Sequence, residues 1–141
     1  MTTTSARKIF VNLAISDLPR TIAFWKRLGF TFNAQFTGDS AACMVVSDDA
    51  YVMFLVPEHF KSFARKPVSD SRKQTEGLYC LSAASRAEVD EIVTTALAAG
   101  ATPAAEPQDH GFMYGSSFYD LDGHHWEVMW MDPAAIAKPT A

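Results

Sequence analysis

Apolar positions in the first half of the chain follow the periods of one strand, one helix and three further strands. The apolar run at 8–16 predicts a buried strand, and apolar residues at helical spacing predict a helix over 18–28. Asp17 is expected to cap this helix, and Gly29 to end it. The shorter apolar runs that follow predict three strands, at 30–37, 41–47 and 51–57.

The second half repeats this order. A strand is predicted at 77–84 and a helix at 86–99, with Ser85 as its cap and Gly100 at its end. Three more strands are predicted, at 101–107, 113–119 and 124–131. The first of these three is weak because it contains two prolines, which cannot donate backbone hydrogen bonds to a sheet.

The pattern is therefore βαβββ twice, which predicts an α+β protein with a degenerate internal repeat. Module 1 is expected to span 8–57 and module 2 to span 77–132. The linker 58–76 opens with a segment that favours a helical turn and continues as a polar stretch. Residues 133–141 are expected to form a frayed tail.

Composition narrows the class of protein. The 141 residues are 48% hydrophobic and 20% charged, with a formal net charge of −4, as in a single globular domain. No basic stripe indicates a nucleic-acid partner, and no apolar run is long enough to predict a membrane span or a signal peptide. We therefore expect a cytoplasmic protein. Cys43 and Cys80 lie in apolar strand segments, so both are predicted to be buried free thiols rather than a disulfide or a nucleophile.

Two stretches carry a resemblance to a known family. The first stretch, residues 11–30, covers a strand and a helix, with Asp-Leu where the helix opens and Phe-Trp…Leu-Gly-Phe where it ends. The second stretch, residues 118–128, reads FYDLDGHHWEV and is a predicted hairpin with a glutamate after its turn. Together, over 8–132, the chain resembles the vicinal-oxygen-chelate superfamily of glyoxalases, bleomycin-resistance proteins and dioxygenases. The resemblance implies a glyoxalase-like, cup-shaped mixed sheet that binds a small molecule. It also implies a homodimer, and a divalent metal held by the first and fourth strand of each module.

The residues at the four implied ligand positions differ from that expectation. These positions fall on Phe10, Phe54, Leu78 and Glu127, and only the last has an oxygen that binds a hard or borderline cation. Asn12 shares the strand face of Phe10, but it offers only an amide oxygen. We therefore expect no firm metal cofactor and at most a divalent cation weakly bound at Glu127.

Glu127 is the leading functional candidate because a carboxylate within an apolar strand needs water, a donor or a ligand. It is interpreted either as a cleft acid/base or residual ligand, or as a relic paired to a nearby donor. His110, before the penultimate strand, is the second catalytic candidate, and its alternative is a solvated loop histidine. His124 and His125 point to opposite strand faces, and at least one of them is expected to be exposed. The residues proposed to bind substrate are Phe10, Asn12, Phe54, Leu78 and Tyr114.

Three functions remain open at this stage. The first is a metal-independent binder of a small apolar or aromatic molecule, which aromatic side chains at ligand positions favour. The second is a lyase or dioxygenase of the lactoylglutathione lyase kind that uses Glu127. The third is a non-catalytic subunit, which no sequence feature supports directly.

Overall fold

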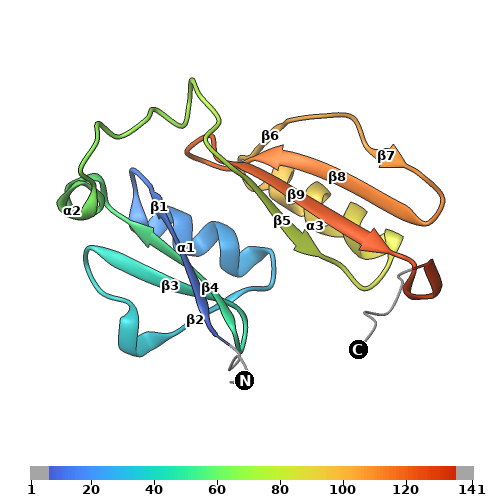
Figure 1. Ribbon diagram of the computed structural model, residues 1–141, viewed down its shortest axis with the longest axis horizontal. Coiled ribbons are helices and arrows are strands. Elements are labelled where there is room, and N and C mark those ends of the chain that lie inside the picture. Colours follow the sequence, from blue (N-terminus) through green and yellow to red (C-terminus); the bar gives the residue numbers. More distant parts are fainter. Residues whose placement is uncertain (1–6, 136–141) are drawn as a thin grey trace, which may run out of the picture. The chain divides into compact units, whose positions relative to one another are not determined.

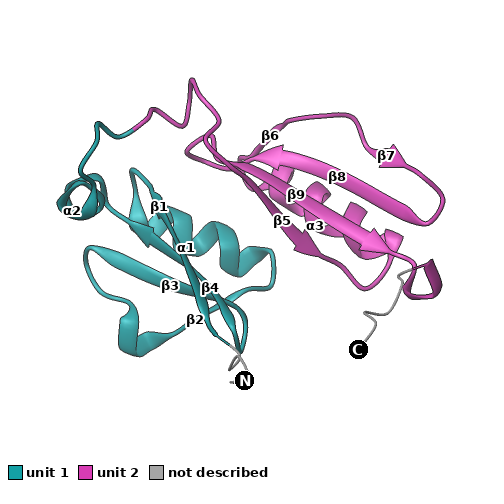
Figure 2. Ribbon diagram, viewed as in Figure 1, with its two compact units in different colours: residues 1–68 teal, residues 69–141 magenta. Residues whose placement is uncertain are grey.

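The computed structural model describes residues 7–135 and divides into two compact units, residues 1–68 and 69–141 (Figure 2). The division falls inside the segment 58–76. The two units are described separately below.

Unit 1 has a four-stranded sheet with helix α1 on one face (Figure 1). The strand order is β1-β4-β3-β2, with β1 and β4 parallel and the other pairs antiparallel. Its elements are β1 (Ile9–Ala14), α1 (Leu18–Arg27), β2 (Thr31–Phe32), the 3-10 helix η1 (Ala34–Phe36), β3 (Ala41–Ser47), β4 (Ala50–Leu55) and α2 (Pro57–Phe63).

Local signals fix the ends of α1 as the sequence predicts. The side chain of Asp17 accepts a hydrogen bond from the backbone N–H of Arg20 at 3.1 Å, which satisfies one free donor of the first turn. Gly29 has a φ of 99°, a left-handed conformation that ends a helix at little cost for glycine. The inner face of α1 buries Trp25, whose ring stacks on that of Phe54 at 5.9 Å.

Unit 2 has a sheet in the order β5-β9-β8-β6, with β7 also paired to β8. Strands β5 and β9 are parallel, and helix α3 packs against β8 and β9 on one face of the sheet (Figure 1). Its elements are β5 (Leu78–Ser82), α3 (Arg86–Ala98), β6 (Thr102–Pro103), β7 (Gln108–Asp109), β8 (Met113–Tyr119), β9 (His125–Met131) and the 3-10 helix η2 (Pro133–Ala135).

The predicted α+β class and the helical start of the linker are confirmed, and two predicted strands are wrong. The strand at 30–37 stops after Phe32, because the Asn33 side chain accepts from the backbone N–H of Gln35 and starts η1. The strand at 101–107 is replaced by β6 and β7, with Pro107 just before the second. Residues 7–135 therefore contain nine strands where eight are predicted.

Three further expectations concern burial and the chain end. Cys43 is buried as predicted, whereas Cys80 is exposed, because it lies on the uncovered face of the edge strand β5. The first residues of the expected tail form η2, and 136–141 lie outside the described residues. None of the helices described is both long and apolar enough to cross a membrane.

Candidate functional site

The sheet of unit 2 has a face covered by α3 and an open face opposite to it. Strand alternation turns Trp126 and Val128 towards α3, where they are 1% and 0% exposed. His125, Glu127 and Met129 therefore point to the open face. In the strand register, the neighbours of Glu127 on this face are Cys80 on β5 and Ser117 on β8.

Glu127 forms an acid–imidazole pair with His125 on this open face. Its Oε2 lies 3.5 Å from His125 Nε2, and the two side chains are 35% and 15% exposed. That nitrogen is buried and has no hydrogen-bond partner in the described structure, so the contact is one of proximity without hydrogen-bond alignment. The ring of Tyr119 packs edge-on against the imidazole at 5.3 Å. A carboxylate and an imidazole held this close can exchange a proton with a bound molecule or hold its polar group.

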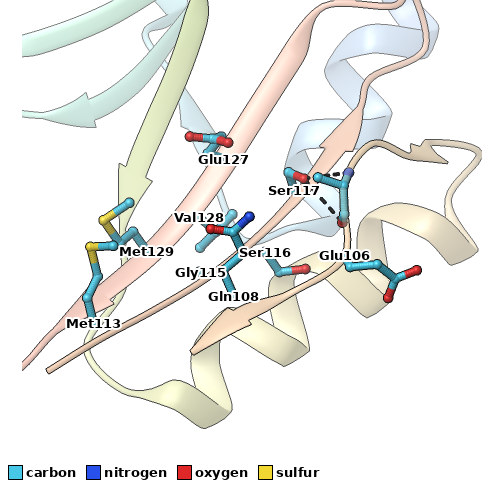
Figure 3. Close-up of a pocket in the computed structure, with 10 residues that line it drawn as sticks. Glu106, Gln108, Met113, Gly115, Ser116, Ser117, Glu127, Val128 and Met129 are labelled. Carbon is cyan, nitrogen blue, oxygen red and sulfur yellow. Dashed lines mark hydrogen bonds between the residues drawn. The ribbon is translucent and has the colours of Figure 1, made fainter. Parts of the chain in front are cut away.

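The Glu127 side chain also lines a small cavity of about 110 Å³ (Figure 3). The wall includes Met113 and Met129 as apolar groups, and Ser117 and Gln108 as polar ones. The Ser117 hydroxyl is engaged, because it accepts from the backbone N–H of Ala105 at 3.0 Å. A space of this size holds one functional group of a guest rather than a whole molecule of the usual ligand size.

Cys80, next to Glu127 in the register, is a poor nucleophile in this setting. Although Cys80 is exposed as a residue, partial desolvation of its thiol raises the pKa above the ordinary value of 9.0, and the negative charge of Glu127 raises it further. The thiol therefore stays protonated near neutral pH, and a thiol reacts poorly without deprotonation.

The turn between β8 and β9, which sets the position of Glu127, is built around a buried carboxylate. Asp120 accepts hydrogen bonds from Trp126 Nε1 at 2.9 Å and from the backbone N–H groups of Asp122 and His124 at 2.9 and 3.0 Å. Burial raises the pKa of Asp120, while these donors act in the opposite direction. Gly123 has a φ of 87°, and a Cβ at this position would lie 2.6 Å from the carbonyl oxygen of Ser71. Only glycine fits that close approach.

The hairpin of β7 and β8 is fastened to α3 by one arginine. Arg86 forms two hydrogen bonds to the Asp109 carboxylate, at 2.7 and 2.9 Å, and one to the carbonyl of Gly111 at 2.8 Å. Its guanidinium also lies over the rings of Tyr114 and Trp130, at 5.3 and 5.1 Å. This cluster holds β7, which contributes Gln108 to the cavity wall.

The Arg86–Asp109 pair predicts a pH-dependent contribution to stability. Hydrogen bonding to Arg86, and then to the backbone of Gly111, lowers the pKa of Asp109 from 3.8 to about 2. A carboxyl group whose pKa is lower in the folded than in the unfolded protein stabilises the fold at pH values above the unfolded pKa. This stabilisation is lost as the pH falls towards the folded pKa. We expect urea unfolding to show Arg86→Gln as less stable than wild type at pH 6, with a difference that shrinks between about pH 4 and 2. A difference constant down to pH 2 would contradict this role.

The sheet of unit 1 also has an open face, opposite α1. The parallel register of β1 and β4 places Phe10 beside Tyr51 and Asn12 beside Met53 on this face. The rings of Phe10 and Tyr51 stack with centroids 4.9 Å apart. Phe10 is 48% exposed, so this face presents an accessible aromatic surface.

The structure separates the predicted site residues into groups. Glu127 and the 61%-exposed Leu78 lie on the open face of unit 2, and Phe10 and Asn12 on that of unit 1. His110 lies between β7 and β8, with its Nε2 3.4 Å from Gln108 Oε1, and it does not line the cavity of Glu127.

Two predicted substrate-binding residues face the helices instead. Phe54 is 0% exposed and packs on Trp25 of α1, so it belongs to the core of unit 1. Tyr114 donates a hydrogen bond to Asp90 of α3, on the face opposite Glu127. Both corrections have the same cause: each side chain lies on the covered face of its strand.

His125 is the residue of the site that the sequence interpretation did not select. Strand alternation already places it on the face of Glu127. The expectation that at least one of His124 and His125 is exposed is wrong, because both are partly buried. Cys80 and Ser117 become neighbours of Glu127 only through strand register, which the sequence does not reveal.

The four positions that the resemblance implies for a metal ion offer one side chain that can bind it. Of the positions implied by the resemblance, Phe10, Phe54 and Leu78 have no donor atom, which leaves Glu127. Among residues 7–135, no three His, Cys, Asp or Glu side chains are grouped so that they could hold an ion.

Comparison with known proteins identifies the family to which this fold belongs. The model of the Glyoxalase/Bleomycin resistance protein/Dioxygenase superfamily matches residues 9–128, and the chain belongs to this family. No curated protein matches the sequence.

Solved structures agree with this assignment. The hypothetical protein SA1046 from S. aureus is 26% identical with a TM-score of 0.75, over 90% of this chain and 95% of that one. The fosfomycin resistance protein FosX from Listeria monocytogenes is 17% identical with a TM-score of 0.62, over 99% and 97%. A lactoylglutathione lyase from Agrobacterium tumefaciens is 18% identical with a TM-score of 0.65, over 90% and 95%. The last two similarities show the fold alone.

Proposed function

We propose that this protein binds a small, largely apolar or aromatic molecule and that Glu127 contacts the polar group of that molecule. One observation carries the proposal: Glu127 lies on an open sheet face, in the wall of a cavity, and its Oε2 lies 3.5 Å from Nε2 of His125. A partly desolvated carboxylate in this position is stabilised by a donor from a ligand.

The surroundings of Glu127 favour a guest that is apolar apart from one polar group. Met113 and Met129 line the cavity, and Leu78 extends the apolar surface to the edge of the sheet. Methionine side chains adapt to guests of different shape. Binding is expected without a resident metal, because the donor set lacks the ligands that would hold one.

A second function, a lyase of the lactoylglutathione lyase kind, has one observation in its favour. The proximity of Glu127 and His125 provides a base and a proton carrier on one face. In that function Glu127 takes a proton from a carbon or oxygen of the substrate.

A thermal-shift screen of chelator-treated protein tests the proposal. The panel takes its compounds from the family and its members: bleomycin, fosfomycin and S-lactoylglutathione, with planar aromatic amines added. We expect at least one compound to raise the unfolding temperature in a saturable manner without added metal. Stabilisation by panel members only after zinc, nickel or manganese is added would contradict metal-independent binding.

We further propose a homodimer. The strands β1 and β5 lie at sheet edges, and three exposed apolar side chains, Ile9, Phe10 and Leu78, lie on them. Uncovered edges with apolar side chains favour pairing with another chain. Light scattering at micromolar concentration should give twice the chain mass of 15.5 kDa, whereas a monomer would overturn the proposal.

A further inference from the structure

Unit 2 has a second hollow, between the polar segment 71–75 and the turn that joins β8 to β9. Gly100, after the end of α3, and Thr102 of β6 also line it. Its volume of about 430 Å³ lies within the range of roughly 300–1,000 Å³ that holds small-molecule ligands. The hollow shares no lining residue with the cavity of Glu127, so the two are separate spaces.

Hydrogen bonds hold this polar segment beside the turn. The Ser71 hydroxyl donates to the carbonyl of Asp122 at 2.7 Å, and Nη2 of Arg72 lies 3.4 Å from the carboxylate of Asp122. The carbonyl of Asp70 accepts from the backbone N–H of Lys73 at 3.0 Å, which fixes the segment from its other end. The hollow is therefore formed before a ligand arrives, and this preorganisation lowers the entropic cost of binding.

The charge of the lining is positive, in a chain whose formal net charge is −4. Arg72 and Lys73 both line the hollow, and Lys73 forms no ion pair within residues 7–135. The lining described over these residues contains one carboxylate, that of Asp120. Asp120 is only 7% exposed, and its oxygens accept from Trp126 and from two backbone N–H groups of the turn. Its negative charge is thus engaged within the turn, and the hollow favours an anion.

The uncharged polar groups of the lining are one amide and three hydroxyls. They belong to Gln74, Thr75, Thr102 and Tyr119. Such groups both donate hydrogen bonds to and accept them from the hydroxyl groups of a ligand. Arginine and lysine bind the oxygens of a phosphate group through charge-assisted hydrogen bonds. The combination favours a ligand that has a phosphate at one end and hydroxyl groups at the other.

We infer that this hollow binds a small phosphate monoester that carries hydroxyl groups. Arg72 and Lys73 contact the phosphate, and the hydroxyls of Thr75, Thr102 and Tyr119 contact the remainder of the molecule. The inference stands independently of the function proposed for Glu127, because the two spaces have different linings and favour guests of different polarity.

Three probes test the chemistry of the hollow by calorimetric titration of the chelator-treated full chain at constant ionic strength. Ribose 5-phosphate has the phosphate and the hydroxyl groups, inorganic phosphate lacks the sugar, and ribose lacks the charge. We expect saturable binding of ribose 5-phosphate and binding roughly three- to tenfold weaker for inorganic phosphate, which loses the hydrogen bonds to the sugar. Ribose should show no saturable binding. Ribose or inorganic phosphate binding as tightly as the ester, or no saturable binding of the ester, would overturn the inference.

A matched pair of lysine variants tests the location. Lys73→Gln should weaken ribose 5-phosphate binding by about five- to tenfold through loss of a charge-assisted hydrogen bond, while Lys66→Gln should leave it unchanged. Lys66 is a suitable control because it is also exposed, carries the same charge and does not line the hollow. Neither lysine forms an ion pair within the described residues, so both variants should keep the wild-type thermal unfolding curve. Equal weakening in the two variants would indicate general attraction to positive charge and would reject the site.

Glu127→Gln separates this inference from the proposed function. We expect it to leave ribose 5-phosphate binding unchanged, because Glu127 does not line the hollow. If it abolishes ribose 5-phosphate binding while Lys73→Gln does not, the probe binds in the cavity of Glu127. The inference then fails, and the proposal for Glu127 stands.

Discussion

Phe54→Ala should destabilise the protein by about 3–5 kcal/mol, and Phe10→Ala by about 1 kcal/mol or less. The two residues are both phenylalanines on neighbouring strands of one sheet, yet their surroundings differ. Phe54 is 0% exposed and stacks on Trp25, so its removal leaves a cavity beneath α1. Phe10 is 48% exposed and loses chiefly its stacking contact with Tyr51.

Urea unfolding followed by circular dichroism measures both changes under one set of conditions. The comparison is matched because residue type, substitution and sheet are the same. Equal losses of stability in the two variants would place both side chains in similar surroundings. That result would reject the division of unit 1 into a covered face with Phe54 and an open face with Phe10.

Glu127→Gln should weaken binding of the panel compound that stabilises the protein most, by about 10- to 100-fold. The reason is the loss of a charge-assisted hydrogen bond, worth roughly 1.5–3 kcal/mol. The substitution keeps the size of the side chain and its place among Cys80, Ser117 and Met129, so the fold should be unchanged. Calorimetric titration of both proteins measures the change.

Glu91→Gln provides the control for this variant, because Glu91 loses the same charge but lies on α3 and does not line the cavity. We expect its affinity to stay within about twofold of wild type, since Glu91 is exposed. If the protein also turns over a substrate, Glu127→Gln should cut the rate by roughly 10²–10⁴-fold, as for loss of a general base. Unchanged binding and turnover would identify Glu127 as a relic of the family's site.

The sequence predicts the order of elements because each boundary carries a local signal. Asp17 and Ser85 cap their helices through side-chain bonds to backbone N–H groups, and Gly29 and Gly100 take positive φ at the helix ends. The predicted strand at 30–37 is wrong, because one asparagine side chain competes with strand pairing after two residues.

The side of a strand on which a residue lies is harder to predict than the strand itself. Strand β4 reads AYVMFL, which is apolar on both faces, so alternation alone does not show whether Met53 or Phe54 points to the helix. The register with β1 decides it, and Met53 shares a face with Asn12. For strand β9 the sequence shows more clearly which residues face the helix, because Glu127 cannot take a buried position against α3 without a partner.

Titration of chelator-treated wild type and Glu127→Gln with the strongest panel ligand tests the central claim most directly. The account predicts that the metal-free wild type binds the ligand and that Glu127→Gln binds it at least about tenfold more weakly. Equal affinities of the two proteins, or binding that returns only when a divalent metal is restored, would contradict it.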